Sequence, residues 1–282
     1  MDVLLEHEAN LRFYLLIGGF GLVALWESFA PRRPLTTPTV PRWGVNIGLT
    51  AVISVLIAWL FPVLAVGTAV IADQRGWGFF NAVNWPGWLV FLLSFLALDL
   101  SRYLQHALLH RVSLLWRLHR VHHSDADYDC TTGLRFHPLE ALFTISVQLA
   151  VVVALGAPPM VVLMYEGIFT LVAMFSHGNI RIPETLDLWL RKVLVTPDMH
   201  RVHHSVIQRE MNSNFGAVFP WWDWLFATYR AQPARGHHGM TLGLAELRGQ
   251  RCVNFAWLLV LPFVEQIRDS AARETIQERI GQ

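Results

Sequence analysis

Histidine spacing limits what this chain can fold into more than any other feature of its 282 residues. Five histidines fall within eighteen residues as an HxxxH box and an HxxHH box: His106, His110, His119, His122 and His123. The HxxHH spacing recurs about eighty residues later in His200, His203 and His204. On helices, residues three or four apart share a face, so each box projects its imidazoles together. Eight clustered imidazoles exceed what one four-coordinate ion needs, which predicts a site for two metal ions.

The alternative is that these histidines only line a polar surface. Thirteen histidines are a modest excess for this length, but eight of them occupy three tight boxes, two of which have identical spacing. Their placement therefore favours metal ligation over a solvated face.

The composition around the boxes indicates a membrane protein. Hydrophobic residues make up 54% of the chain and charged residues only 15%, and there are twelve tryptophans. A formal net charge of +1 excludes the concentrated basic face that nucleic-acid binding requires. Two cysteines, Cys130 and Cys252, are too few for a disulfide framework.

Five apolar segments are long enough to be membrane spans, for which about 20 residues are needed. They cover approximately residues 11–30, 45–72, 86–99, 139–155 and 160–175, and the second is long enough to break near Pro62. The third continues into the first histidine box. The fourth and fifth form a hairpin around Gly156, which leads to His177. The predicted fold is an all-α integral membrane protein with about five spans and a cytosolic helical cap that carries the histidine boxes.

Basic residues orient these spans. The segment 31–43 contains three arginines and no acid, which places it in the cytoplasm by the positive-inside rule. Five arginines near the boxes favour the same side: Arg102, Arg111, Arg117, Arg120 and Arg135. The loop 73–83 is then external, as is the N-terminus. The acidic start of the chain is a poor signal peptide, so the first span is expected to remain.

Later segments complete a single predicted domain, residues 1–282. An apolar stripe over 182–195 predicts a helix that lies on the membrane surface. Thr196, Pro197 and Asp198 resemble a helix start for the third box. The apolar run 252–263 is too short to span, and the tail 265–282 is expected to be a solvated helix.

The three boxes, HALLH, HRVHH and HRVHH, resemble those of the fatty acid hydroxylase/sterol desaturase superfamily. The surrounding sequences LWRLHRVHHSDADYDCTTGLRFHPLE and VTPDMHRVHHSVIQREMNSNFG are similar to its bacterial sterol-desaturase-like branch. The resemblance covers about residues 90–230, so the first 82 residues are placed by hydropathy alone. Three spaced boxes in a membrane chain are a specific signal, whereas a single HxxxH would be weak.

This resemblance implies a non-haem di-iron oxygenase that uses O2 to attack an unactivated C–H bond of a lipid. The eight box histidines would act in catalysis through the two iron ions, with His177 as a ninth ligand, and zinc could replace iron on purification. The chain has neither a G-x-G-x-x-G fingerprint nor a haem module, so an external electron donor, a separate redox protein, is expected. The expected location is a bacterial inner membrane with the boxes towards the cytoplasm.

Five further residues are candidates for contacts around the ligands: Asp99, Tyr103, His137, Glu166 and Asn179. On one helix Asp99 and Tyr103 share the face of the first box, so we expect Asp99 to hold a histidine of the second or third box and Tyr103 to lie near His106. The alternative for Asp99 is a residue that only marks the membrane boundary.

The other candidates have alternatives too. His137 is either close to the metals or structural. Glu166 lies inside the fifth span, where an acid is functional or takes part in a structural hydrogen bond. Asn179 either reaches a metal through water or caps a helix.

The remaining histidines and a tryptophan cluster have simpler predicted roles. His237 and His238, in a glycine-containing loop, are expected to be exposed, and no role is expected for His7. Trp221, Trp222 and Trp224 resemble an interfacial aromatic belt.

A second function class fits histidine-rich membrane helices, namely a metal or proton transporter with a histidine-lined path. A transporter should place histidines and carboxylates near the middle of its spans, whereas most of these histidines lie beyond the apolar runs. Within the enzyme class, hydroxylation, desaturation, ether-lipid cleavage and carotenoid hydroxylation share the same boxes. The sequence leaves the substrate and the oligomeric state open.

Overall fold

A computed structural model describes residues 7–264 and is built from helices, with only isolated β-bridges between loops in that part of the chain. The predicted solvated tail 265–282 lies outside the described residues. Five helical segments are long and apolar enough to cross a membrane, as expected: Asn10–Phe29, Thr39–Asn81, Gly87–Arg111, Pro138–Leu155 and Pro159–Ser176. The all-α membrane fold predicted from the apolar runs is therefore confirmed.

The long helices are α2 (Glu8–Phe29), α3 (Thr39–Leu60), α5 (Gly87–Arg111), α7 (Pro138–Leu155) and α8 (Pro159–Ser176). The second predicted span is two helices, because α3 ends before Pro62 and α4 (Ala65–Arg75) follows after a short break. Proline cannot donate a helical hydrogen bond and disfavours helical geometry at the preceding residue. α2 and α4 pack against α8, and α5 packs against α7 and α8.

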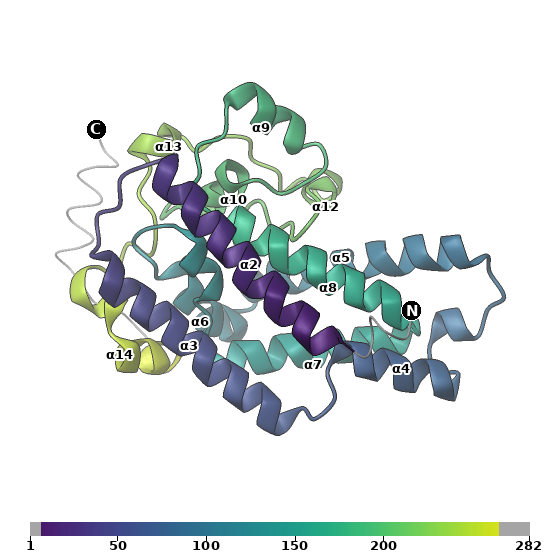
Figure 1. The fold of residues 1–282 in the computed structure, drawn as a ribbon. Coiled ribbons are helices and arrows are strands. Elements are labelled where there is room, and N and C mark those ends of the chain that lie inside the picture. The colour runs from purple at the N-terminus through teal and green to yellow at the C-terminus, as the bar shows by residue number, and fades with distance from the viewer. Residues whose placement is uncertain (1–6, 265–282) are drawn as a thin grey trace.

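The hairpin between α7 and α8 turns at Gly156, which has φ of +63° and caps the end of α7. A Cβ atom there would lie 2.6 Å from the carbonyl oxygen of Trp77. Only glycine allows both this conformation and this close approach. The loop after α4, with the short helix η1 (Phe79–Asn81), thus packs directly against the turn, at the end of the bundle remote from the histidines (Figure 1).

Short helices form a cap at the opposite end of the bundle (Figure 1). They are α6 (Ser113–His123), η2 (Cys130–Leu134), α9 (Glu184–Leu190), α10 (Pro197–His203), α11 (Gln208–Met211), α12 (Trp221–Leu225), α13 (Gly236–Gly239), η3 (Gly249–Val253), α14 (Phe255–Val260) and η4 (Leu261–Phe263). α10 packs against the end of α8, and α6 packs against η4. The loop between α2 and α3 joins this cap, since Arg33 donates to the carbonyl oxygens of His237 and Met240. The basic loop and the boxes therefore lie at the same end of the spans, as predicted.

A buried network of charged side chains fixes the loop after the second box. Arg42, at the start of α3, donates to Asp125 at 2.8 Å and also pairs with Asp129. Arg135 donates to Asn46 at 2.9 Å and to the carbonyl oxygen of Cys252 at 2.6 Å. Arg42 faces two carboxylates and the donors of Arg135 meet neutral oxygens, so two guanidinium charges are set against two carboxylate charges in the interior. The network ties α3 and the C-terminal segment to the loop that follows α6.

The interfacial helix predicted over 182–195 is shorter, since α9 ends at Leu190. Arg191, predicted to lie off the apolar stripe, is buried and forms an ion pair with Asp187. Leu186, Trp189 and Val193 remain exposed. The predicted start of the third-box helix is confirmed, with Thr196 as N-cap and Pro197 in the first turn.

Candidate metal centre

The first two boxes meet because the chain turns sharply between two helices. His106 and His110 lie in the last two turns of α5, and α6 begins at Ser113 after a non-helical Val112. This turn brings the ring centroids of His106 and His119 to 5.0 Å, and those of His110 and His123 to 4.8 Å.

α10 inserts the third box between the other two. The ring of His203 lies 4.5 Å from that of His106 and 4.6 Å from that of His123, measured between centroids. The ring of His204 lies 4.6 Å from that of His122. His177, which directly follows α8, lies 4.5 Å from His200. The nine histidines predicted as ligands are therefore all brought together.

They form two groups in which each residue offers one nitrogen, and within each group these nitrogens lie within 4.8 Å of one another. Group A is His106, His110, His119, His123 and His203, and group B is His122, His177, His200 and His204. In each HxxHH box the first and last histidines, one helical turn apart, join one group, and the middle histidine joins the other. The second box gives its pair to group A and the third box gives its pair to group B. This division explains why the spacing is HxxHH rather than HxxxH alone.

Hydrogen bonds to the outer nitrogens set the ring orientations. The Nδ1 atoms of His106 and His203 lie 3.0 Å and 2.8 Å from the carbonyl oxygens of Phe215 and Ser213. The Nδ1 atom of His177 lies 2.7 Å from the carbonyl oxygen of Ala173. A carbonyl can only accept, so each Nδ1 carries the proton and each Nε2 keeps its lone pair. These rings present an unprotonated nitrogen to the group, as a metal requires.

The inner nitrogens fit a metal and little else. The Nε2 atoms of His106, His119, His203 and His204 are buried and have no hydrogen-bond partner among the described residues. The Nε2 atom of His177 lies 3.3 Å and 3.2 Å from those of His122 and His200. Neighbouring ligands with metal–nitrogen bonds of about 2.1 Å are separated by about 3.0–3.4 Å, so a cation between these lone pairs satisfies the spacing.

Electrostatics keep the rings neutral. Burial lowers the pKa of His177 to about 4. Burial and neighbouring histidines also hold the pKa values of His122, His123, His200, His203 and His204 well below the usual range. Neutral imidazole is the form that binds metal, so these six rings do not need to lose protons at neutral pH.

Glu140 is a site residue that the sequence reasoning missed. Its Oε1 atom accepts a hydrogen bond from Nδ1 of His119 at 2.6 Å, and its side chain is buried. Such carboxylates orient metal-bound histidines and raise their basicity. The available signal was an acid in the first turn of an apolar span, directly after the RFHP sequence.

Asp99 contacts no histidine, contrary to the expectation. Its carboxylate accepts hydrogen bonds from the backbone N–H groups of Val218 and Phe219, at 3.1 Å and 3.2 Å, and from the side chains of Tyr165 and Trp222. Asp99 lies seven residues before His106 on α5, which is about 10 Å along the helix axis. Asp99 instead holds the loop whose Phe215 carbonyl orients His106. Tyr103 is on the expected face but pairs with Thr228, with an oxygen–oxygen distance of 2.9 Å.

The other three candidates are structural. His137 caps α7, because its Nδ1 accepts from the N–H of Leu139 and its Nε2 donates to the carbonyl oxygen of Leu259. Asn179 bonds both N–H and C=O of Arg33, and so fixes the loop between α2 and α3. Glu166 forms an ion pair with Arg12 and accepts from Gln148.

His237 was expected to be exposed but is buried, with its Nε2 3.5 Å from a carboxylate oxygen of Asp198. The loop folds back over the start of α10, which the glycine content of this segment does not reveal. His238 is exposed, as expected, and contacts Arg32.

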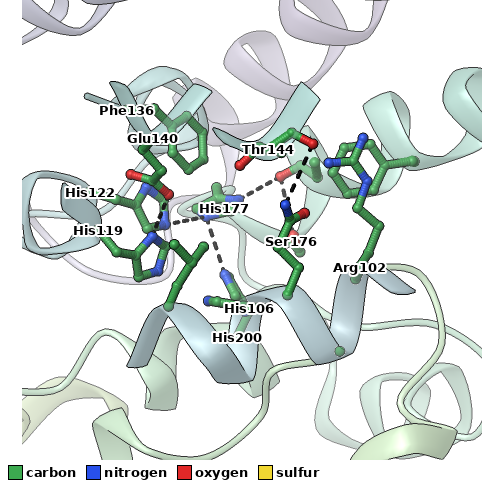
Figure 2. Close-up of a pocket in the computed structure, with 17 residues that line it drawn as sticks. Arg102, His106, His119, His122, Phe136, Glu140, Thr144, Ser176, His177 and His200 are labelled. Carbon is green, nitrogen blue, oxygen red and sulfur yellow. Dashed lines mark hydrogen bonds and ion pairs between the residues drawn. The ribbon is translucent and has the colours of Figure 1, made fainter. Parts of the chain in front are cut away.

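A cavity of about 190 Å³ reaches the histidines from between α5, α7 and α8. Its lining includes five of the histidines and four apolar residues: His106, His119, His122, His177 and His200, with Leu109, Phe136, Phe169 and Ala173. Figure 2 shows Glu140 against His119, with Arg102 on the far side of the cavity from His119 and His122. The arrangement can hold an apolar chain beside the two groups.

The segment that contains the histidines is similar to known proteins. Residues 91–228 match the model of the fatty acid hydroxylase family. The ornithine lipid hydroxylase OlsE of Rhizobium tropici is 30% identical over 64% of this chain and 54% of its own length. The human alkylglycerol monooxygenase is 29% identical over 62% of this chain and 38% of its own length. The Δ(7)-sterol-C5(6)-desaturase of Nicotiana tabacum is 28% identical over 52% of each chain. The chain thus spans about half the length of these curated relatives, and no solved structure matches.

Proposed function

We propose that the protein is a membrane-bound di-iron oxygenase of lipids, because residues 91–228, which carry all nine histidines, match the model of the fatty acid hydroxylase family. It would use O2 and electrons to hydroxylate or desaturate a C–H bond. One observation carries the proposal: two groups of buried imidazoles, with unpaired nitrogens facing inward, adjoin an apolar cavity between membrane helices. The relatives' names, which specify ornithine lipids, alkylglycerols and sterols, support a lipid substrate.

In this proposal group A and group B each hold one ion. Bound iron would supply the reduction of O2 and the attack on an unactivated C–H bond, and zinc could take its place during purification. The chain's part is to fix the rings: the Phe215, Ser213 and Ala173 carbonyls and the Glu140 carboxylate orient His106, His203, His177 and His119. Fixed ligands of this kind require little rearrangement during reaction.

The cavity would select and position the substrate. The side chains of Leu109, Phe136 and Phe169 would exclude water from the cavity and form an apolar surface against which a lipid tail can pack. A lipid would enter the cavity from the bilayer, between α5, α7 and α8. A hydroxylation consumes O2, two electrons and two protons for each alcohol and water formed, so a separate redox protein must deliver electrons.

Two further features of the proposal concern organisation. The chain would act as one domain over residues 1–282, in a bacterial inner membrane. The histidine cap would face the cytoplasm, because the arginine-rich segment 31–43 lies at that end. This orientation would place the metals within reach of a cytosolic electron donor.

The test compares lipids from cells that express the wild-type protein, the His203→Ala variant or the His238→Ala variant. His203 is in group A, whereas His238 is exposed and outside both groups. Wild type and His238→Ala should give a lipid that has gained one oxygen or lost two hydrogens, and His203→Ala should not. Purified protein should consume O2 over repeated turnovers only when a reductant is added. Unchanged lipids with the wild-type protein, at two bound irons per chain and with a reductant supplied, would contradict the proposal.

A further inference from the structure

Arg102 is a charged side chain within a membrane-spanning helix and lines the cavity. It lies on α5, one turn before His106, and is half-buried. A charge in a span costs several kcal/mol unless it faces a polar partner or a cavity, so its surroundings indicate its role.

The partners of Arg102 hold its guanidinium group without neutralising it. One end of the group donates to Oε1 of Gln148, and its carbon atom lies 4.8 Å from the centroid of the Phe169 ring. The amide of Gln148 is itself fixed, since its Nε2 donates to Glu166 at 2.6 Å. Glu166 forms an ion pair with Arg12, which also pairs with Glu8 at 3.6 Å. The chain Arg12–Glu166–Gln148 therefore ends in a neutral oxygen that orients Arg102.

The other donors of Arg102 stay available. Within residues 7–264, no carboxylate lies within ion-pair distance of Arg102. Its Nε and Nη1 atoms make no hydrogen bond there, and they are not among the atoms enclosed by protein. An oriented guanidinium with two free N–H directions in a cavity matches a carboxylate or phosphate.

We propose that Arg102 binds the acidic group of an amphiphilic substrate and thereby determines which carbon lies beside the histidines. The inference deepens the proposed function and rests on it. Arg102 and His106 are about 6 Å apart along α5, and Phe169 and His177 are about 12 Å apart along α8. The carbon attacked would accordingly lie a fixed, short distance along the chain from the acid. The substrate class is an acidic lipid, with carboxylate and phosphate as the two sources of the oxyanion.

The alternative is that Arg102 only fastens α5 to α7 and α8. Binding of three twelve-carbon probes to the metal-loaded full chain in a neutral detergent separates the two roles. The probes are dodecanoate, dodecyl phosphate and methyl dodecanoate, and each dissociation constant is measured by calorimetry. The wild type should bind at least one acidic probe about tenfold or more tightly than the ester, as expected for hydrogen bonds to a charged group.

The variants are Arg102→Gln and Arg102→Lys, with Arg111→Gln as the matched control because Arg111 is exposed on the same helix. Arg102→Gln should bind acid and ester within about twofold, Arg102→Lys should keep part of the preference, and the control should keep all of it. Equal binding of acid and ester by the wild type would overturn the proposal, as would an unchanged preference in a folded Arg102→Gln protein.

If Arg102→Gln fails to fold, the Lys variant decides the question. A folded Arg102→Lys protein with the full wild-type preference would overturn the oriented-guanidinium account. Because these are binding measurements, they stand apart from the proposed function. If the wild-type protein binds two metals and prefers the acidic probes but oxidises no lipid, the proposed oxygenase activity is refuted and the proposed acid-binding site is not.

Discussion

Removal of the Glu140 carboxylate tests whether the buried hydrogen bond to His119 supports a metal ion. The carboxylate contacts Nδ1 of His119 at 2.6 Å, and both side chains are buried. Loss of a partner of this kind usually weakens metal binding about 10- to 100-fold. This corresponds to about 1.4–2.8 kcal/mol, which also matches the cost of leaving a buried N–H without an acceptor.

Two substitutions separate the contribution of the negative charge of Glu140 from that of its hydrogen bond. Glu140→Gln keeps an oxygen that can accept from His119 but removes the negative charge, so we expect a loss of about tenfold. Glu140→Ala removes both, and the loss should approach the upper end of the range. Glu184→Gln is the control, because it is the same substitution at an exposed residue, at the start of α9.

The assay is competition of each purified protein with a chelator for Fe²⁺ or Zn²⁺, and circular dichroism checks that the helices are retained. The two ions should respond differently, because His119 belongs to group A and the Gln or Ala change leaves group B complete. The ion of group A should therefore weaken more than the ion of group B, whose own ligands are unchanged. A folded Glu140→Ala protein that binds both ions within about twofold of the wild type would refute the reasoning.

Three further predictions follow from the same structure. Metal analysis of protein from iron-replete cells should approach two ions per chain, and His203→Ala should lower this to about one; one ion in active wild type would exclude two groups. A cysteine at Arg209 should be labelled only from the cytoplasmic side and one at Gln74 only from outside, with little background because Cys130 and Cys252 are buried; the reverse pattern would invert the topology. Metal-free protein should lose stability as the pH falls from 6.5 to about 4, because the folded pKa of His177 is about 4 and the unfolded ring binds a proton first. The free energy of unfolding should fall by about 3 kcal/mol for this ring, at about 1.4 kcal/mol per pKa unit. His177→Gln should therefore flatten the dependence of the melting temperature on pH. An unchanged dependence would contradict the lowered pKa of His177.

The sequence predicted what depends on local periodicity. Apolar runs of sufficient length predict spans whatever they pack against, and the spans of the structure agree, including the break near Pro62 that divides α3 from α4. The N-cap at Thr196 was equally local, because the hydroxyl reaches an N–H within its own first turn. The matched family region confirms the resemblance that the boxes indicated.

The sequence could not predict contacts that depend on how loops return. Asp99 shares a helix face with His106, yet its partners are residues 218, 219 and 222, which only the tertiary fold brings to α5. His137 matches a family position near the site, which made a contact with the metals or their ligands one expectation, and in the structure it caps α7. His237 lies in a sequence typical of an exposed loop and is buried against Asp198. In each case distant chain segments decided the partner of the side chain.

The division of each HxxHH box between two groups has a consequence for assembly. His122 and His123 are consecutive, and their ring planes lie at 90° to each other; those of His203 and His204 lie at 81°. α6 and α10 must therefore each lie between both metal positions, and a rotation of either helix disturbs both groups at once. Neither group can be completed by one helix alone, because every group needs rings from α6 and α10 together with His106 and His110 of α5 or His177 after α8. The two ions should consequently bind in a coupled manner, in which the first ion fixes the helices that supply ligands to the second.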